Sequence, residues 1–247
     1  MKNIMLIALL LLAYTADAQI TLNQSDYPAS VIGTDSLKKT TYTSAFPSLA
    51  PMAGGLWDMS VVTDTTPVYF AYRVPTTTYQ FADSNTYSFI GFPYQANIQT
   101  NITSSGILEY GLFIFSAGYS LTSITLNPTD SLFIPAQNSL FTTPHIKIAF
   151  PTAMSGSWLS LYKDCLLYTS PSPAYSLSHA PGVVRRYVTE SDSVTGWGRI
   201  RVKDVSGSPS AYLDILQVRT TTFTTDSFFL NGAPMSGVLL SALSLTQ

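Results

Sequence analysis

Residues 183–203 read VVRRYVTESDSVTGWGRIRVK, and residues 213–230 read LDILQVRTTTFTTDSFFL. Valine, isoleucine, threonine, tyrosine and phenylalanine dominate both stretches, and clusters of Ser, Gly, Pro and Asp interrupt or separate them. This pattern is typical of antiparallel strands joined by short loops. It predicts a strand over 183–190, a polar turn, a strand over 196–203, a second turn at 206–210, and a strand over 213–230.

The composition extends this prediction to the whole chain. Only 11% of the residues are charged, and the net charge is −2; an average globular protein has about 25% charged residues. The only glutamates are Glu109 and Glu190, and no window after residue 18 shows the apolar spacing of an amphipathic helix. We therefore expect an all-β fold, an antiparallel β-sandwich of the jelly-roll or immunoglobulin-like type, with no substantial helix apart from a signal peptide.

The N-terminus has the parts of a secretory signal peptide. Lys2 supplies a positive charge, residues 4–12 form an apolar run, and residues 16–18, Ala-Asp-Ala, form a small-x-small cleavage motif. We expect residues 1–18 to be removed and the protein to be secreted or held at the cell surface, with no membrane span after cleavage. Residues 19–247 suit a single β-sandwich domain, and a change in composition at 135–145 leaves a division into two lobes open.

Other segments of the chain are also strand-like. Tyr94, Ala96, Ile98, Thr100 and Ile102 alternate with polar residues, which predicts a half-buried strand. The other predicted strands are 54–62 (a turn and a strand with Trp57 buried), 68–73, 107–115 as a central strand covered on both faces, 119–126, 131–134, and 145–150 with Ile146, Ile148 and Phe150 inward.

Four sets of short motifs are spread over most of the chain. They are Gln19-Ile20-Thr21-Leu22, Gly54-Gly55-Leu56-Trp57-Asp58-Met59-Ser60, Phe150-Pro151 with Gly156-Ser157-Trp158, and Gly196-Trp197-Gly198 with Leu216-Gln217-Val218-Arg219. Together they resemble a group of poorly characterised secreted β-rich proteins of Bacteroidota. The resemblance implies export, often by type IX secretion, and a surface or extracellular location. The group has no assigned activity, and this chain departs from it because no recognisable C-terminal sorting domain follows Leu230.

The same resemblance implies O-glycosylation at Asp-Ser or Asp-Thr pairs that precede a small or aliphatic residue. The matching positions are Ser36, Thr65, Ser131 and Ser193. The alternative is that these pairs are ordinary turn-starting dipeptides.

Residues 165–173, CLLYTSPSP, resemble the in-frame translation of a sequencing adapter. We therefore hypothesise that residues 165–181 are partly foreign to the gene and that its own sequence resumes near Val183. The nucleotide sequence tests this hypothesis, because codons that differ from the adapter would exclude it. Cys165 is the only cysteine, so no intrachain disulfide is expected. If Cys165 is native, its neighbours Leu166 and Leu167 predict a buried, inert thiol.

No catalytic site can be identified from motifs. The chain has two histidines, His145 and His179, and no Gly-x-Ser-x-Gly elbow. Glu109 and Glu190 do not stand out as a carboxylate pair for glycoside hydrolysis. Burial of Glu109 among apolar neighbours would raise its pKa, whereas a salt bridge to an arginine is the commoner arrangement. The chain has no metal-binding cluster by spacing, and we expect no cofactor and no nucleic-acid partner.

The most distinctive chemical feature is a basic strand. Arg199, Arg201 and Lys203 alternate with apolar residues, and Trp197 shares their parity unless Gly196 or Gly198 carries a bulge. With Arg185 and Arg186 nearby in sequence, this face suits an acidic surface polysaccharide or the carboxylates of an envelope protein, with Trp197 as a stacking platform. The alternative is a solvated outer face that discourages edge-to-edge association.

From these features we expect an exported, non-enzymatic β-sandwich that acts in cell-surface structure or adhesion. A carbohydrate-binding module is the alternative, which three or more aromatic side chains on one exposed sheet face would favour. A hydrolase is the third alternative, which a cleft with a carboxylate pair would favour.

Overall fold

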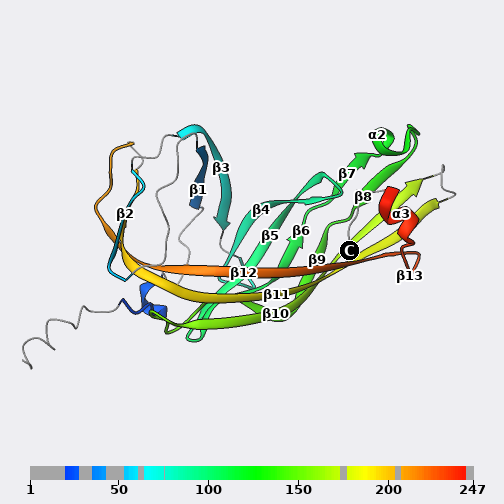
Figure 1. The fold of residues 1–247 in the computed structure, drawn as a ribbon. Coiled ribbons are helices and arrows are strands. Elements are labelled where there is room, and N and C mark those ends of the chain that lie inside the picture. The colour runs from blue at the N-terminus through cyan, green and yellow to red at the C-terminus, as the bar shows by residue number, and fades with distance from the viewer. Residues whose placement is uncertain are drawn as a thin grey trace, which may run out of the picture.

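The computed structural model describes residues 20–27, 35–42, 53–60, 64–74, 76–172, 177–203 and 207–242 (Figure 1). Two antiparallel sheets pack against each other, which confirms the predicted all-β sandwich. The helices within these ranges are short: η1 (Gln24–Asp26), α2 (Thr122–Thr125) and α3 (Gly237–Ala242). The predicted signal peptide, residues 1–18, lies outside the described residues.

The first sheet has six strands in the spatial order β1-β3-β4-β5-β6-β9. From β3 to β6, strands that follow one another along the chain are also neighbours in the sheet. At the tip of the β4–β5 hairpin, Ile90 and Gly91 both have positive φ, as a tight two-residue turn requires. The strands are β1 (Asp35–Tyr42), β3 (Asp64–Val74), β4 (Phe81–Phe89), β5 (Phe92–Thr103), β6 (Gly106–Ile114) and β9 (Gln137–Ala149).

The second sheet has the order β13-β12-β11-β10-β8-β7, and a further strand, β2, pairs in parallel with the end of β11. The three longest strands, β10, β11 and β12, run side by side along the molecule (Figure 1). The strands are β2 (Gly55–Asp58), β7 (Ala117–Ser120), β8 (Ser131–Ile134), β10 (Ser157–Ser172), β11 (Leu177–Arg201), β12 (Leu213–Leu230) and β13 (Ala233–Pro234).

The predicted polar turn at residues 191–195 is wrong. β11 runs through this segment as one strand of 25 residues, interrupted only by a bulge between Val194 and Gly196. A polar run looks like a turn when it is considered alone. Here β12 pairs with residues 191–194 and β10 with residues 191–193, so most backbone groups of the segment are satisfied in ladders, and Asp192 and Val194 are buried.

The main hydrophobic core lies between the two sheets, and β5 shows how the sequence pattern produces it. Tyr94, Ala96, Thr100 and Ile102 are buried and Ile98 is half-buried, as the alternation predicted. The buried members of this core are Phe89, Tyr94, Ala96, Leu112, Ile114, Leu121, Leu132, Ile134, Leu166, Tyr168, Val184, Phe228, Met235 and Leu240. Trp57, at one end of the second sheet, is also buried, as predicted.

The predicted strand over 119–126 is right only at Tyr119 and Ser120, because β7 ends at Ser120 and α2 follows. The hydroxyl of Ser120 accepts a hydrogen bond from the backbone N–H of Thr122 (3.2 Å), and this local bond turns the chain away from the strand direction.

The facing predicted for 145–150 is wrong at its first residues. β6 pairs Leu108 with Ile146 and Ile107 with Ile148, so Lys147 is left out of register as a bulge. The bulge changes the alternation, and His145 takes the buried position while Ile146 is half-buried. Ile148 and the buried Phe150 belong to a second, smaller core cluster, as expected.

β9 and β10 join the two sheets along one side, through side chains rather than a backbone ladder. The Ser160 hydroxyl accepts from the backbone N–H of Ile146 (3.0 Å), and the Trp158 indole N–H donates to the Ile146 carbonyl (2.9 Å). Further along, the Ser139 hydroxyl accepts from the backbone N–H of Cys165 (2.9 Å). This seam holds the two sheets at a fixed spacing on one side of the sandwich.

Residues 165–172, the described part of the adapter-like segment, belong to β10. They pair in register with β11, and Leu166 and Tyr168 are buried in the main core. Cys165 is exposed, so the predicted buried thiol is wrong: alternation along the strand places Leu166 inward and Cys165 outward. The foreign origin of this segment stays a prediction for the nucleotide sequence to test.

Candidate functional site: a polar pocket between the sheets

A pocket of about 260 Å³ opens between the inner faces of the two sheets. The sequence did not predict this pocket, because no motif indicates a place where ionisable side chains converge. The first sheet contributes Tyr87 from β4, Glu109 from β6, and Phe141 and His145 from β9; the second contributes Tyr162 and Asp164 from β10, Arg186 from β11, and Thr222 and Thr224 from β12.

The register of the three long strands brings these residues together. Three rows cross β10, β11 and β12 on the inner face, because side chains of one parity project to one side of a sheet. The rows are Ser160, Glu190 and Thr222; Tyr162, Val188 and Thr224; and Asp164, Arg186 and Asp226.

His145 connects the two glutamates of the chain. Its Nδ1 lies 2.9 Å from Oε2 of Glu109 in the same sheet, and its Nε2 lies 2.6 Å from Oε1 of Glu190 in the opposite sheet. Lys147 donates to the other oxygen of Glu109 (2.9 Å), and Thr222 donates to the other oxygen of Glu190 (3.0 Å). These five residues, called the histidine cluster below, link β6 and β9 to β11 and β12.

The two carboxylates favour the protonated form of His145. Burial alone would lower the pKa of His145, but the hydrogen bonds and charges of Glu109 and Glu190 raise it. Burial alone would raise the pKa of Glu109, but His145 and Lys147 hold it below its ordinary value. An ionised carboxylate only accepts hydrogen bonds, so the imidazolium donates through both ring nitrogens. The partner of Glu109 is therefore a histidine with a lysine, and the predicted arginine is wrong.

Asp164, Arg186 and Asp226 form a second group in the pocket. The Arg186 guanidinium donates through Nε and Nη2 to the two oxygens of Asp226 (3.1 and 3.4 Å). Asp164 lies opposite Arg186 in the strand register, yet its carboxylate makes no hydrogen bond or ion pair with any residue that the structure describes. Burial raises the pKa of Asp164, the charge of Arg186 opposes the rise, and Asp226 adds to it.

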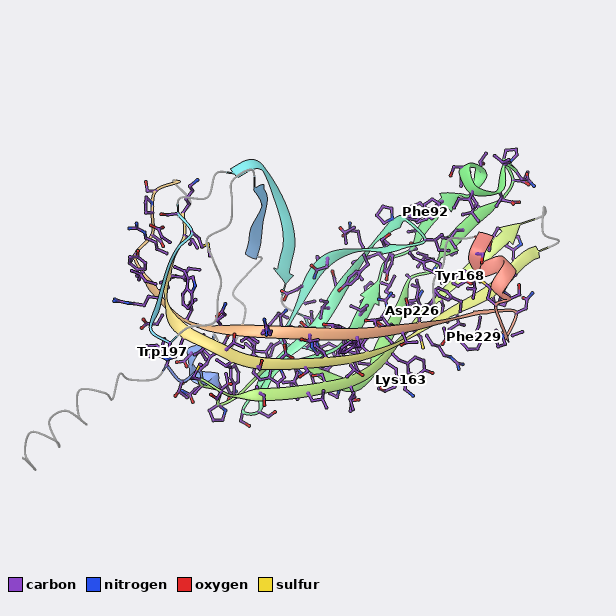
Figure 2. All side chains as sticks on the ribbon, in the orientation of Figure 1. Phe92, Lys163, Tyr168, Trp197, Asp226 and Phe229 are labelled. Carbon is purple, nitrogen blue, oxygen red and sulfur yellow. The ribbon has the colours of Figure 1, made fainter. Side chains whose placement is uncertain are left out.

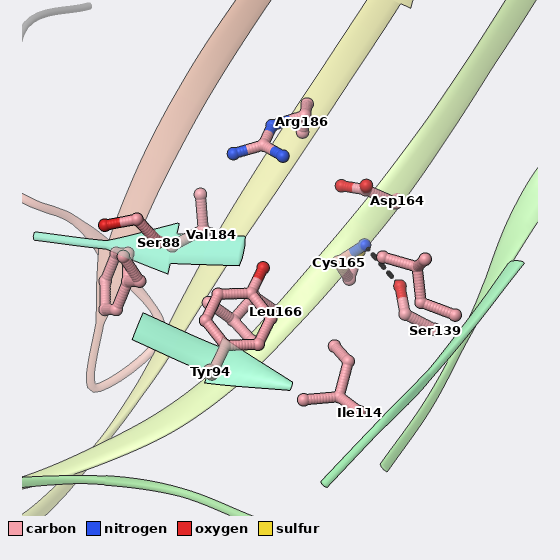
Figure 3. A pocket seen from close by; sticks show the side chains of 11 residues that line it. Ser88, Tyr94, Ile114, Ser139, Asp164, Cys165, Leu166, Val184 and Arg186 are labelled. Carbon is pink, nitrogen blue, oxygen red and sulfur yellow. Dashed lines mark hydrogen bonds between the residues drawn. The ribbon is translucent and has the colours of Figure 1, made fainter. Parts of the chain in front are cut away.

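Asp164 and Arg186 also line a narrow neighbouring cavity of about 20 Å³, room for one water-sized molecule (Figure 3). Figure 3 shows the two side chains on adjacent long strands, with Tyr94 below them on β5. Burial raises the pKa of Tyr94 to about 12, so its hydroxyl stays protonated at neutral pH.

The predicted basic face lies elsewhere, near the far end of β11, where Figure 2 labels Trp197. Arg199 and Lys203 are exposed, whereas Trp197 is half-buried against Gly54. Arg201 is held by an ion pair with Asp58 and lies over the ring of Tyr212. β11 is not an edge here, since β12 pairs on one side and β2 on the other.

Arg185 and Arg186, adjacent in sequence, point to opposite faces. Arg185 is exposed on the outer face with its guanidinium 4.7 Å from the ring centroid of Phe229, and Arg186 reaches Asp226 on the inner face. Only Arg186 belongs to the pocket.

The four predicted O-glycosylation positions all lie in strands. Ser36, Thr65 and Ser131 are at the start of β1, β3 and β8, and Ser193 is half-buried within β11. Glycosylation at these positions stays a prediction.

No protein-family model matches the chain, and comparison with curated proteins and with solved structures finds no match either. Across the described ranges, no group of three or more His, Cys, Asp or Glu side chains is arranged to hold a metal ion, and none of the helices has the length and apolar character to cross a membrane.

Proposed function

We propose that the protein is exported and acts at the cell surface as a non-enzymatic β-sandwich that binds carbohydrate, in adhesion or in envelope structure. The pocket between the sheets carries this proposal. Sugars present hydroxyl groups that both donate and accept hydrogen bonds, together with apolar C–H faces. The pocket offers a carboxylate, a guanidinium and hydroxyl groups beside the aromatic rings of Tyr87, Phe141 and Tyr162.

Aromatic side chains on the outer face of the long strands also support a carbohydrate ligand. Tyr187, Phe223 and Phe229 lie on that face, with Tyr187 and Phe223 exposed and Phe229 half-buried.

The histidine cluster supports binding rather than catalysis. Both glutamates are already bound to the same imidazolium, and the pKa of Glu109 is lowered, so Glu109 is a poor proton donor. A general acid needs a raised pKa and a free approach to the substrate.

A glycan-array screen of the chain from Gln19 onward, followed by a cell-surface binding assay with the best glycan as competitor, tests the proposal. We expect saturable binding to at least one glycan and competition at the cell surface. Binding to cells that no glycan competes with, or no binding in either assay, would overturn it.

A glycoside hydrolase is the second candidate, favoured by one observation. Asp164 and Glu109 line the same pocket, and their environments move their pKa values in opposite directions. If this pair catalyses hydrolysis, the protein should release reducing sugar from a bound glycan, and Asp164→Asn should abolish the release. Bound glycan recovered intact after long incubation excludes this alternative.

A further inference from the structure

We infer that the pocket holds a single uncharged sugar ring, and that Asp164 and Arg186 are the pair that recognises its hydroxyl groups. This inference rests on the proposed carbohydrate binding and names the class of sugar and the residues that select it.

The first argument is the hydrogen-bonding capacity that the pocket leaves unused. The Asp164 carboxylate has no hydrogen-bonding partner among the described residues, and Arg186 uses only Nε and Nη2 for Asp226. A guanidinium has five N–H groups, so three remain to donate. A free acceptor and free donors on neighbouring strands match two adjacent hydroxyl groups, each of which can donate and accept.

The second argument is the wall of the pocket. Tyr162 packs between Phe141 and His145, with ring centroids 4.5 and 5.1 Å away, so its ring position is fixed. Burial raises the pKa values of Tyr87 and Tyr162, and both phenols stay neutral. Neither hydroxyl is bonded to another described residue, so each is available to a ligand beside an apolar ring face.

The third argument is charge. The pocket and its ion-pair partners contain four carboxylates, Glu109, Glu190, Asp164 and Asp226, and three cations, Lys147, Arg186 and protonated His145. The three cations are bound to carboxylates, and the net charge is −1 with Asp164 ionised and zero with it protonated. An acidic sugar would meet Asp164 without a free counter-charge, so the pocket selects against it.

The fourth argument is size. The pocket volume of about 260 Å³ is below the ~300–1,000 Å³ typical of sites for drug-sized ligands. It suits one ring, such as the terminal residue of a glycan, rather than a length of chain.

Titration calorimetry with methyl glycosides of glucose, galactose and mannose, and with the matching methyl uronides, tests the inference. We expect at least one neutral glycoside to bind. The affinity for its uronide should be lower by about tenfold or more, because the carboxylate of the uronide and that of Asp164 repel each other. Asp164→Asn should weaken the neutral glycoside about tenfold and narrow the gap between glycoside and uronide. Tyr162→Phe, which keeps the ring, should lower the affinity for the neutral glycoside by a few fold. Asp58→Asn, which lies outside the pocket, should leave this affinity unchanged.

A uronide that binds as tightly as its glycoside, or unchanged affinity in well-folded Asp164→Asn, would overturn the inference. If glycan arrays still show binding in either case, the proposed carbohydrate function stands and only the site and sugar class are wrong. If the wild-type chain binds no glycan on the array, the proposed function fails as well.

Discussion

Two stretches of the same strand, β11, differ in how they use their charged residues. At 197–201, Trp197, Arg199 and Arg201 lie close together in sequence. Among the residues that the structure describes, Arg201 alone of the three has a charged partner, and Arg199 is exposed. At 186–190, no motif connects Arg186 with Glu190, yet each meets ionisable groups from other strands inside the sandwich. A charged site depends more on what lies across the sheets than on how many charges follow one another along a strand.

Burial explains why this difference matters energetically. The side chains of Glu109, His145 and Glu190 are 8, 10 and 15% exposed, whereas those of Asp58 and Arg201 are 28 and 34% exposed. Removing one partner of a buried ion pair leaves a charge that water cannot solvate, whereas exposed pairs are screened. Substitutions at the two stretches should therefore have very different effects.

The largest expected effect is on folding stability. His145→Ala leaves two buried glutamates without their shared cation, and we expect the free energy of unfolding to fall by about 3–5 kcal/mol. Urea denaturation at pH 6 measures it. Lys147→Ala is the matched control, because Lys147 is 46% exposed, and it should cost no more than about 1 kcal/mol. Equal losses in the two variants would show that the cluster does not act as a buried unit.

The histidine cluster should also give stability a defined pH dependence. His145, with a raised pKa in the folded state, stabilises fully below its ordinary pKa of about 6.5 and loses this effect as pH rises through the raised value. Glu109, with a lowered pKa, stabilises above its ordinary value of about 4.5 and loses this effect as pH falls through the lowered value. Melting temperature should therefore be highest between about pH 4.5 and 6.5.

The double variant Glu109→Gln/His145→Gln is the control for this profile. Its melting temperature should change less between pH 6 and pH 9 than that of the wild-type chain. If the double variant and the wild-type chain show the same dependence of melting temperature on pH, other titratable groups cause that dependence.

Asp164→Asn should separate stability from binding. Burial disfavours the ionised form of Asp164 in the folded state and so raises its pKa. The uncharged amide of Asp164→Asn should therefore increase the melting temperature slightly at pH 7. Differential scanning calorimetry at pH 7 measures the change. A clear decrease would mean that the carboxylate has a partner that stabilises the fold.

The smallest effects are expected at the basic end of β11. Arg201→Ala removes the ion pair with Asp58 and should lower melting temperature slightly, and less in high salt than in low salt. Arg199→Ala, at an exposed position, should leave melting temperature unchanged in the same thermal scans.

The sequence predicted the fold much better than the site. Alternation along β5 and the buried Trp57 followed directly from local patterns. The polar segment 191–195 was predicted as a turn because the strands that pair with it are not adjacent to it in sequence. His145 was assigned to the wrong face because the bulge at Lys147 cannot be recognised from composition. Glu109 and Glu190 were recognised as the only glutamates, but their contact with one histidine depends on the pairing of β6 with β9 and on sheet stacking.

The central claim is that the inner pocket, rather than the basic strand, binds the ligand. Affinity for the best neutral glycan should be compared for the wild-type chain, Asp164→Asn, and the double variant Arg199→Ala/Lys203→Ala. We predict a loss of about tenfold in Asp164→Asn and wild-type affinity in the double variant. The reverse result, full affinity in Asp164→Asn and a loss of affinity in the double variant, would contradict the account. It would show that the basic strand binds the ligand.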